Sequence, residues 1–376
     1  MIDHHKILRQ LLSFDTTSCN SNLSAINCIE NIFKKHHKFE IIKVYNNKKD
    51  KCSILIKPRQ EVTNGILFSG HIDTVPVTGQ KWSSNPFKYV LKNKKIYARG
   101  ATDMKSFISV IISNMINSKS NFPICLSVTH DEETGCDGIY NLLKYLKKNK
   151  ISLPDKCIVG EPTMLKVVSA NKGVEIIETV LKTNSEEGHS SNYNQKMNTI
   201  TASANLVTYL QSIQNKIPKK NTLKCIPKNS SIHIGIVNGG TSHNIIPKKT
   251  SFRWELRYIK NDILFVKKNF FAYQEKFLKK YRKQIINLEI ENNVLFAVPG
   301  LNEKNQSKIL NFMKNYNYTK KYHVPYGTEA GILQNHGLST IIFGPGSINQ
   351  AHKPNEYISV NQINKFNNLI KNITNK

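Results

Sequence analysis

Residues 65–73, GILFSGHID, carry an apolar run directly into a histidine and an aspartate. Three further apolar runs lead into polar residues in the same way: 124–129 before His130-Asp131-Glu132-Glu133, 156–160 before Glu161, and 339–344 before a glycine-rich loop that reaches His352. Runs of this kind, alternating with helical patterns, are typical of the buried strands of an α/β sheet. Because ligands bind beyond the carboxyl ends of such strands, we expect these polar residues to form one site.

A helical pattern begins directly after Asp103. Apolar residues recur every three or four positions and form one stripe: Met104, Phe107, Ile108, Ile111, Ile112 and Met115. Asp103 therefore lies at the N-terminus of the predicted helix, where a carboxylate commonly serves as an N-cap. The same position would also direct the carboxylate toward the polar edge of the sheet, and the two roles are compatible.

The middle of the chain predicts a second, inserted domain. Strands are predicted over 174–181, 231–237, 250–258 and near 285–290, and helices over 197–217 and 262–282. Alternation in the third strand places Trp254 on one face and Arg257 on the other. The order βαββαβ is that of a ferredoxin-like α+β sandwich. We therefore predict an α/β domain formed by residues 1–171 and 292–376, and an inserted domain over residues 172–291.

The composition is that of a folded protein with two domains. The 376 residues are 39% hydrophobic and 21% charged, which excludes a disordered chain and a minimal disulfide scaffold. The formal net charge of +28 would suit a polyanion-binding protein, but the lysines are spread along the chain, whereas a nucleic-acid footprint is clustered. Seven cysteines without a CxxC pair fit a reducing compartment, and the sequence shows neither a signal peptide nor a membrane-spanning run. We expect a soluble, cytoplasmic protein without a specific nucleic-acid or membrane partner.

Seven ionisable side chains lie at the predicted polar edge: His71, Asp73, Asp103, Glu132, Glu133, Glu161 and His352. Each pair of neighbours alone, such as a His-x-Asp or a Glu-Glu, is more often structural than functional. Together, however, five carboxylates at one low-dielectric edge would repel one another strongly unless a cation neutralised them. Imidazole and carboxylate donors without a thiolate suit Zn²⁺, Co²⁺ or Mn²⁺. The combination therefore predicts a metal site.

Seven motifs occur along the chain in a fixed order: SGHIDTVP (69–76), ARGATDMK (98–105), HDEETGCDG (130–138), VGEPT (159–163), GHSS (188–191), GGTSHNIIP (239–247) and FGPGSINQAHKPNEY (343–357). On these motifs the chain resembles the M20 family of di-zinc amidohydrolases, most of all its acetylornithine deacetylases and next its succinyl-diaminopimelate desuccinylases. The resemblance implies an α/β, mixed-sheet, di-zinc peptidase-like catalytic domain with an inserted α+β ferredoxin-like lid and dimerisation domain. It also implies a homodimer.

The resemblance assigns five ligands to two divalent metal ions, with Zn²⁺ expected and Co²⁺ as the alternative. His71 and Glu161 would bind one ion. Glu133 and His352 would bind the other, and Asp103 would bridge both. Family members hold this aspartate with a cis peptide on its C-terminal side.

Two further residues are expected to act in catalysis. Asp73 would orient the imidazole of His71, and Glu132 would be the general base for a metal-bridged hydroxide. The resemblance thus implies hydrolysis of N-acetyl-L-ornithine to L-ornithine and acetate, a step of arginine biosynthesis. The alternative substrates are succinyl-diaminopimelate, other N-acyl amino acids and dipeptides. Alternatives of another class are a polyanion-binding protein and a catalytically silent relative.

Four residues are expected to contact the substrate: His189, Asn244, Arg257 and Glu329. His189 matches the family histidine that reaches the active site of the partner subunit, and Asn244 matches the asparagine of the lid motif. Arg257 would bind an α-carboxylate bidentately, and the alternative is an ion pair with Glu255 within the sheet. Glu329, in the segment GTEA, would face the cationic end of the substrate. The loop that carries His189 departs from the family pattern, since residues 182–185 lack the usual glycine and 192–195 lack the usual proline.

Overall fold

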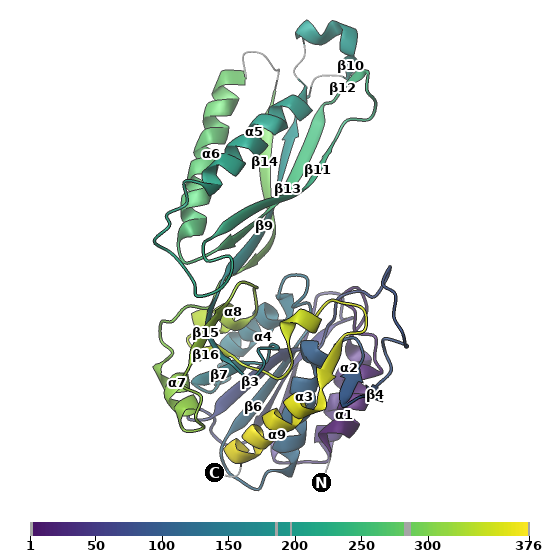
Figure 1. Cartoon of the computed structure of the whole chain (residues 1–376), viewed down its shortest axis with the longest axis vertical. Helices are drawn as coiled ribbons and strands as arrows, with labels where there is room; N and C mark the ends of the chain where they lie inside the picture. The colour runs from purple at the N-terminus through teal and green to yellow at the C-terminus, as the bar shows by residue number, and fades with distance from the viewer. Residues whose placement is uncertain (1–2, 185–186, 196–197, 282–286, 375–376) are drawn as a thin grey trace. The chain divides into compact units, whose positions relative to one another are not determined.

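The computed structural model describes residues 3–184, 187–195, 198–281 and 287–374. The chain divides into two compact units (Figure 1). The first comprises Met1–Ala170, Leu301–Tyr322 and Thr328–Lys376, and the second comprises Asn171–Gly300 and His323–Gly327. The last strand of the second unit, β14 (Glu289–Val298), has ten residues, whereas the sequence predicts a short strand near 285–290. Residues 285–286 of the predicted strand lie outside the described residues.

The first unit is built on an eight-stranded mixed sheet with the order β1-β2-β6-β3-β7-β16-β8-β15. Its strands are β1 (Phe39–Tyr45), β2 (Cys52–Pro58), β3 (Ile66–His71), β6 (Ile124–Thr129), β7 (Lys156–Val159), β8 (Val167–Asn171), β15 (Lys321–Val324) and β16 (Ser339–Ile342). β3 is parallel to β6 and β7, and β7 is parallel to β16. Every residue of β3, β6 and β16 is buried, as expected for central strands of an α/β sheet. The predicted fold class is confirmed.

Helices pack against this sheet. α1 (His4–Leu12), α2 (Leu23–Lys34), α3 (Ser106–Asn117), α7 (Ser307–Lys314) and α9 (Val360–Thr374) share one apolar core with the strands. α3 and α9 lie in front of the sheet in Figure 1, whereas α4 (Asp137–Lys148) contacts β1, β2 and β6, and α8 (Ala330–Asn335) contacts β7 and β16. Among the described residues, no helix is both long enough and apolar enough to cross a bilayer.

A small three-stranded sheet connects two distant segments of the first unit. It consists of β4 (Val90–Lys92), β5 (Lys95–Tyr97) and β17 (Tyr357–Ser359), in the order β17-β5-β4. β17 pairs with β5, with Tyr357 opposite Tyr97. This pairing places the segment that follows His352 beside the segment that precedes Asp103.

The second unit has the predicted βαββαβ order. Its main elements are β9 (Gly173–Lys182), α5 (Thr199–Gln214), β11 (Ser231–Gly239), β13 (Lys249–Tyr258), α6 (Asp262–Tyr281) and β14. The antiparallel sheet has the order β11-β13-β9-β14, and α5 and α6 share its core around Trp254. Two short strands, β10 (Gly188–His189) and β12 (Ile245–Ile246), pair beside the 3-10 turn η2 (Ser190–Gln195). The ferredoxin-like prediction is confirmed.

Candidate functional site

Parallel strands deliver the predicted polar residues to one edge of the large sheet. His71 is the last residue of β3, Glu132 and Glu133 follow β6, and Glu161 follows β7. His352 lies in the loop between β16 and β17. Because β3, β6, β7 and β16 run in the same direction, their carboxyl ends bring these side chains together.

The carboxylate of Asp103 lies between two histidines. Its Oδ1 atom is 3.1 Å from Nε2 of His71, and its Oδ2 atom is 3.4 Å from Nε2 of His352. Nε2 of His71 is also 3.9 Å from Oε1 of Glu161. Nε2 of His352 is 3.1 Å from Oε2 of Glu133. The structure therefore contains two histidine–carboxylate pairs that share one aspartate.

Two sets of three side chains bring possible ligand atoms within 4.8 Å of one another: His71, Asp103 and Glu133, and His71, Glu132 and Glu161. Their donors are imidazole nitrogens and carboxylate oxygens, which suit a borderline divalent cation. In addition, Oε1 of Glu161 is buried without a hydrogen-bond partner in the described chain. These donors fit a metal centre. Glu132, expected as the base, lies close enough to be counted among them.

The acids of this cluster are poorly solvated. Burial raises the pKa of Glu132 and of Glu161 well above the usual value, and neighbouring acids raise both further. Burial also raises the pKa of Glu133, an effect opposed by its hydrogen bond with His352. Concentrated negative charge in a buried place is costly, and a bound divalent cation would relieve that cost.

The two histidines are surrounded by negative charge. Burial lowers the pKa of His71, but hydrogen bonds with Asp103 and Asp73 outweigh this effect and raise it well above 6.5. Hydrogen bonds with Asp103 and Glu133 raise the pKa of His352 to about 10. For Asp103, burial favours a higher pKa, but the bonds from His352 and His71 lower it below its usual range. The neighbouring carboxylates therefore stabilise a positive charge at the imidazole of each histidine.

The turn that carries Asp103 differs from the predicted helix cap. Residues Ala101–Lys105 form a π-type turn, α3 begins only at Ser106, and Lys105 occupies its N-cap position. Because Lys105 and not Asp103 is the N-cap residue of α3, the N-cap interpretation is wrong, and the carboxylate of Asp103 instead faces His71 and His352. The peptide bond between Asp103 and Met104 is cis, as the resemblance implied.

Comparison with known proteins agrees with this geometry. The model of Peptidase family M20/M25/M40 matches residues 67–376. The chain belongs to this family. It is accordingly a hydrolase of the M20 type.

M20 relatives cover most of the chain. Acetylornithine deacetylase of Buchnera aphidicola subsp. Acyrthosiphon pisum (strain Tuc7) is 31% identical over 323 residues, which are 83% of this chain and 80% of the relative. A tripeptidase from Staphylococcus aureus superposes with a TM-score of 0.75 at 15% identity and covers 100% of this chain and 99% of its own. The YXEP protein of Bacillus subtilis, a dinuclear metal binding peptidase from the M20 family, gives a TM-score of 0.65 at 14% identity and covers 99% and 98%. At these identities the two solved structures show the fold alone.

Asp73 makes more contacts around the candidate site than the single contact with His71 that was predicted. Nδ1 of His71 lies 2.9 Å from the backbone carbonyl of Asp73 and 3.6 Å from its Oδ1 atom. The carboxylate also accepts the backbone N–H groups of Glu132 and Glu133, each at 3.2 Å, and the hydroxyl of Ser18 at 2.8 Å. Asp73 therefore connects the end of β3 to the acidic turn after β6, in addition to contacting the imidazole.

Three predicted substrate-binding residues lie in the second unit. His189 is exposed and hydrogen-bonded to the hydroxyl of Ser191, and Oδ1 of Asn244 accepts the hydroxyl of Ser242. Arg257 donates two hydrogen bonds to Glu255, at 2.7 and 3.1 Å. The structure thus contains the intra-sheet pair that was the alternative for Arg257. The substrate-binding roles stay predictions.

Glu329 lies beneath the polar edge rather than open to solvent. It is 1% exposed, and its carboxylate accepts hydrogen bonds from the hydroxyls of Ser69 and Thr129. Burial raises its pKa, and the two hydroxyls oppose this rise only in part. The carboxylate of Glu329 therefore does not face solvent, where a cationic substrate could reach it directly. A substrate role for Glu329 stays a prediction.

Sequence reasoning did not single out Glu356 and Arg99. Glu356 is buried four residues after His352, and Arg99 is buried four residues before Asp103. Both belong to the motifs quoted above. The signal that the sequence offered was a charged residue four positions from an expected metal ligand, and for Glu356 also the small number of acidic residues in the chain, 26. Their contacts with each other depend on the fold, as described below.

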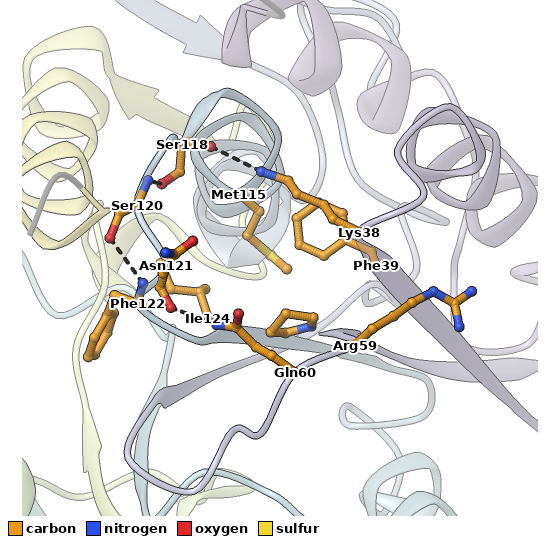
Figure 2. A pocket seen from close by; sticks show the side chains of 11 residues that line it. Lys38, Phe39, Arg59, Gln60, Met115, Ser118, Ser120, Asn121, Phe122 and Ile124 are labelled. Carbon is orange, nitrogen blue, oxygen red and sulfur yellow. Dashed lines mark hydrogen bonds between the residues drawn. The ribbon is translucent and has the colours of Figure 1, made fainter.

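A cavity of about 260 Å³ lies at the opposite end of the strands (Figure 2). It is bordered by Phe39 at the start of β1, Pro58 at the end of β2 and Ile124 at the start of β6. Nζ of Lys38 reaches the backbone carbonyl of Ser118 across it, at 3.0 Å. None of its 11 lining residues is an acid or a histidine, so this cavity has no ligands of the kind found at the other edge.

Proposed function

We propose that this protein hydrolyses N-acetyl-L-ornithine to L-ornithine and acetate with the help of two divalent metal ions. The observation that carries the proposal is the carboxylate of Asp103, which presents one oxygen toward His71 and the other toward His352. In a two-metal amidohydrolase, a carboxylate of this kind would offer one oxygen to each of two neighbouring ions. The choice of substrate is supported by the relatives at 28–31% identity that are named acetylornithine deacetylase.

The donor set divides into two halves around Asp103. His71 and Glu161 would hold one ion, and Glu133 and His352 would hold the other. Zn²⁺ is the proposed ion and Co²⁺ the alternative, since both accept imidazole and carboxylate ligands. When bound, such a pair of ions acidifies a shared water, whose pKa falls toward about 7, and polarises the amide carbonyl.

Glu132 is the proposed general base. It is adjacent in sequence to the ligand Glu133, and Asp73 fixes the backbone of both residues. Its carboxylate would take the proton of the attacking water and deliver it to the departing amine, which is otherwise too basic to leave. Asp73 would also keep the imidazole of His71 in one orientation.

The second unit is proposed to supply substrate contacts. His189 would donate a hydrogen bond to the oxyanion in the active site of a partner subunit, which requires a homodimer. Asn244 would contact the substrate, and Arg257 would bind its α-carboxylate after exchanging its pairing with Glu255. The reaction would serve arginine biosynthesis in the cytoplasm.

The test is the release of amine from N-acetyl-L-ornithine and, in parallel, from N-succinyl-diaminopimelate. Protein stripped of metal is assayed before and after addition of Zn²⁺ or Co²⁺. The proposal expects metal-dependent turnover of the acetyl substrate that exceeds turnover of the succinyl substrate. Turnover of the succinyl substrate alone would reject the proposed substrate, and equal turnover without metal would reject the metal-dependent reaction.

A further inference from the structure

The carboxylate of Glu356 is the acceptor of four converging N–H groups. Oε2 accepts Nη1 of Arg99 at 2.9 Å and the backbone N–H of Gly100 at 3.0 Å. Oε1 accepts the backbone N–H groups of Thr102 at 2.8 Å and Asp103 at 3.1 Å. The Glu356 side chain is 1% exposed. A buried carboxylate that receives this many donors is rigidly held and holds its donors in turn.

All four donors belong to one turn, residues 99–103, whose backbone does not form a regular helix. Gly100 has a φ of +78°, and Asp103 lies outside the helical region. Backbone N–H groups in such a turn lack the partners that a helix would provide. Glu356 supplies those partners from a segment more than 250 residues away in sequence. The turn therefore receives its shape from Glu356 rather than from local hydrogen bonds alone.

The segment that carries Glu356 also carries His352. This segment is fixed at two further points, because Nε2 of Gln80 donates to the backbone carbonyl of His352 at 3.1 Å and Oδ1 of Asn355 accepts the N–H of Ser83 at 2.8 Å. One short segment thus places a histidine against Oδ2 of Asp103 and, four residues later, binds the N–H of the same aspartate. The position of Asp103 is determined from both sides.

We propose that Glu356 is a positioning residue that holds Asp103 where its two oxygens can serve two divalent ions. This inference rests on the metal centre of the proposed function and not on the identity of the substrate. A purely structural ion pair between Glu356 and Arg99 would stabilise the fold and leave metal binding unchanged. A positioning role changes metal binding specifically, since residues that hold metal ligands commonly alter metal affinity about 10- to 100-fold when they are replaced.

The test compares Glu356→Gln with the wild type and with Asp262→Asn. Asp262 is the matched control because it is a buried acid of the second unit that accepts hydrogen bonds from Asn221 and Ser230. Each metal-free protein is titrated with Co²⁺, and the visible absorption and the magnetic coupling between the two ions are recorded. We expect about 10- to 100-fold weaker binding of at least one ion in Glu356→Gln, with loss of the coupling, and wild-type binding in Asp262→Asn.

The outcomes separate this inference from the proposed function. Equal Co²⁺ affinities and equal coupling in Glu356→Gln and the wild type would overturn the positioning role. The same weakening of Co²⁺ binding in Asp262→Asn would also overturn it, because the effect would then follow the loss of any buried acid. A wild-type protein that binds two ions but hydrolyses neither test substrate would reject the proposed function and leave the positioning role intact.

Hydrogen exchange in the wild type tests the same inference if Glu356→Gln does not fold. We expect the backbone N–H groups of Thr102 and Asp103 to exchange slowly in the metal-free protein, because Glu356 already binds them. Exchange of these two groups at the rate of exposed loops, with protection only after metal is added, would overturn the positioning role.

Discussion

Asp103 offers one carboxylate oxygen to each of two histidines, and this arrangement explains why an acid is needed at that position. Oδ1 faces His71 and Oδ2 faces His352. An amide side chain of the same shape would provide one acceptor oxygen and no charge. The two halves of the proposed metal centre therefore depend on both oxygens of a single residue.

Replacing Glu132 by alanine should separate catalysis from metal binding. Without a base to transfer protons, we expect turnover of N-acetyl-L-ornithine to fall by roughly 10²- to 10⁴-fold, while elemental analysis still finds two ions per chain. Glu61→Ala, which removes an exposed acid of the same unit, is the control and should behave as the wild type. Unchanged turnover in Glu132→Ala would remove the general-base role. Loss of an ion would instead make Glu132 a ligand, as its proximity to His71 and Glu161 allows.

Replacing His352 by alanine should remove one ion and leave the other. His352 contacts Glu133 and Asp103, so its loss weakens one half of the centre, whereas His71 and Glu161 remain. Metal content is measured after dialysis against a weak chelator. His336→Ala, which removes an exposed histidine at the end of α8, should retain both ions. Two tightly held ions in His352→Ala would contradict the ligand role.

Among the elements, the strands that lead into polar residues could be predicted and the local irregularities could not. The apolar runs before His71 and Glu161 are strands because a buried sheet needs continuous apolar residues. Strict alternation would place Ile236 on the same face as Ile232 and Ile234, but a register shift between Ile234 and Ile236 turns it outward, and it is 44% exposed. Such a bulge depends on pairing with a neighbouring strand. The alternation within one segment carries no information about that pairing.

Gly160 tests the packing between β7 and α3. A Cβ atom at this position would lie 2.3–2.4 Å from ring atoms of Phe107, which is fully buried in α3. We expect Gly160→Ala to lower the free energy of unfolding by about 1–3 kcal/mol, the usual cost of overpacking a core, in a urea titration. At Gly235 the nearest atom is 3.5 Å away, so Gly235→Ala should change stability by no more than about 0.5 kcal/mol. Equal stability of the two variants would contradict the tight contact between Gly160 and Phe107.

His4 in α1 should make the protein less stable as the pH falls. Burial lowers the pKa of His4 to about 4, His5 and Lys371 lower it as well, and Asp3 opposes them. The unfolded chain binds a proton near pH 6.5, whereas the folded chain resists it, so stability is lost as the pH falls from about 6.5 toward about 4.

The measurement is the melting temperature at pH 7 and at pH 5. His4→Gln does not titrate, so its melting temperature should fall less over this interval than that of the wild type. His37→Gln, which replaces an exposed histidine, should follow the wild type. The same decrease in all three proteins would show that His4 does not contribute to the pH dependence.

At the scale of the whole molecule, the sequence predicts the two units and the edge that holds the site, but not the contacts that fix it. The order of strands and helices is contained in local patterns, which is why the inserted βαββαβ unit was predictable. The bond from Arg99 to Glu356 joins residues 257 positions apart, and no local pattern connects them. The length of β14 is likewise set by its pairing with β9 up to Val298, which the pattern of one segment does not reveal.

The account as a whole requires two metal ions, one on each side of Asp103. Crystals grown with Zn²⁺ and measured above and below the zinc absorption edge test this directly. We expect two anomalous peaks about 3.5–4 Å apart, one beside His71 and Glu161 and the other beside Glu133 and His352. A single peak, or peaks only at other surfaces, would contradict the account.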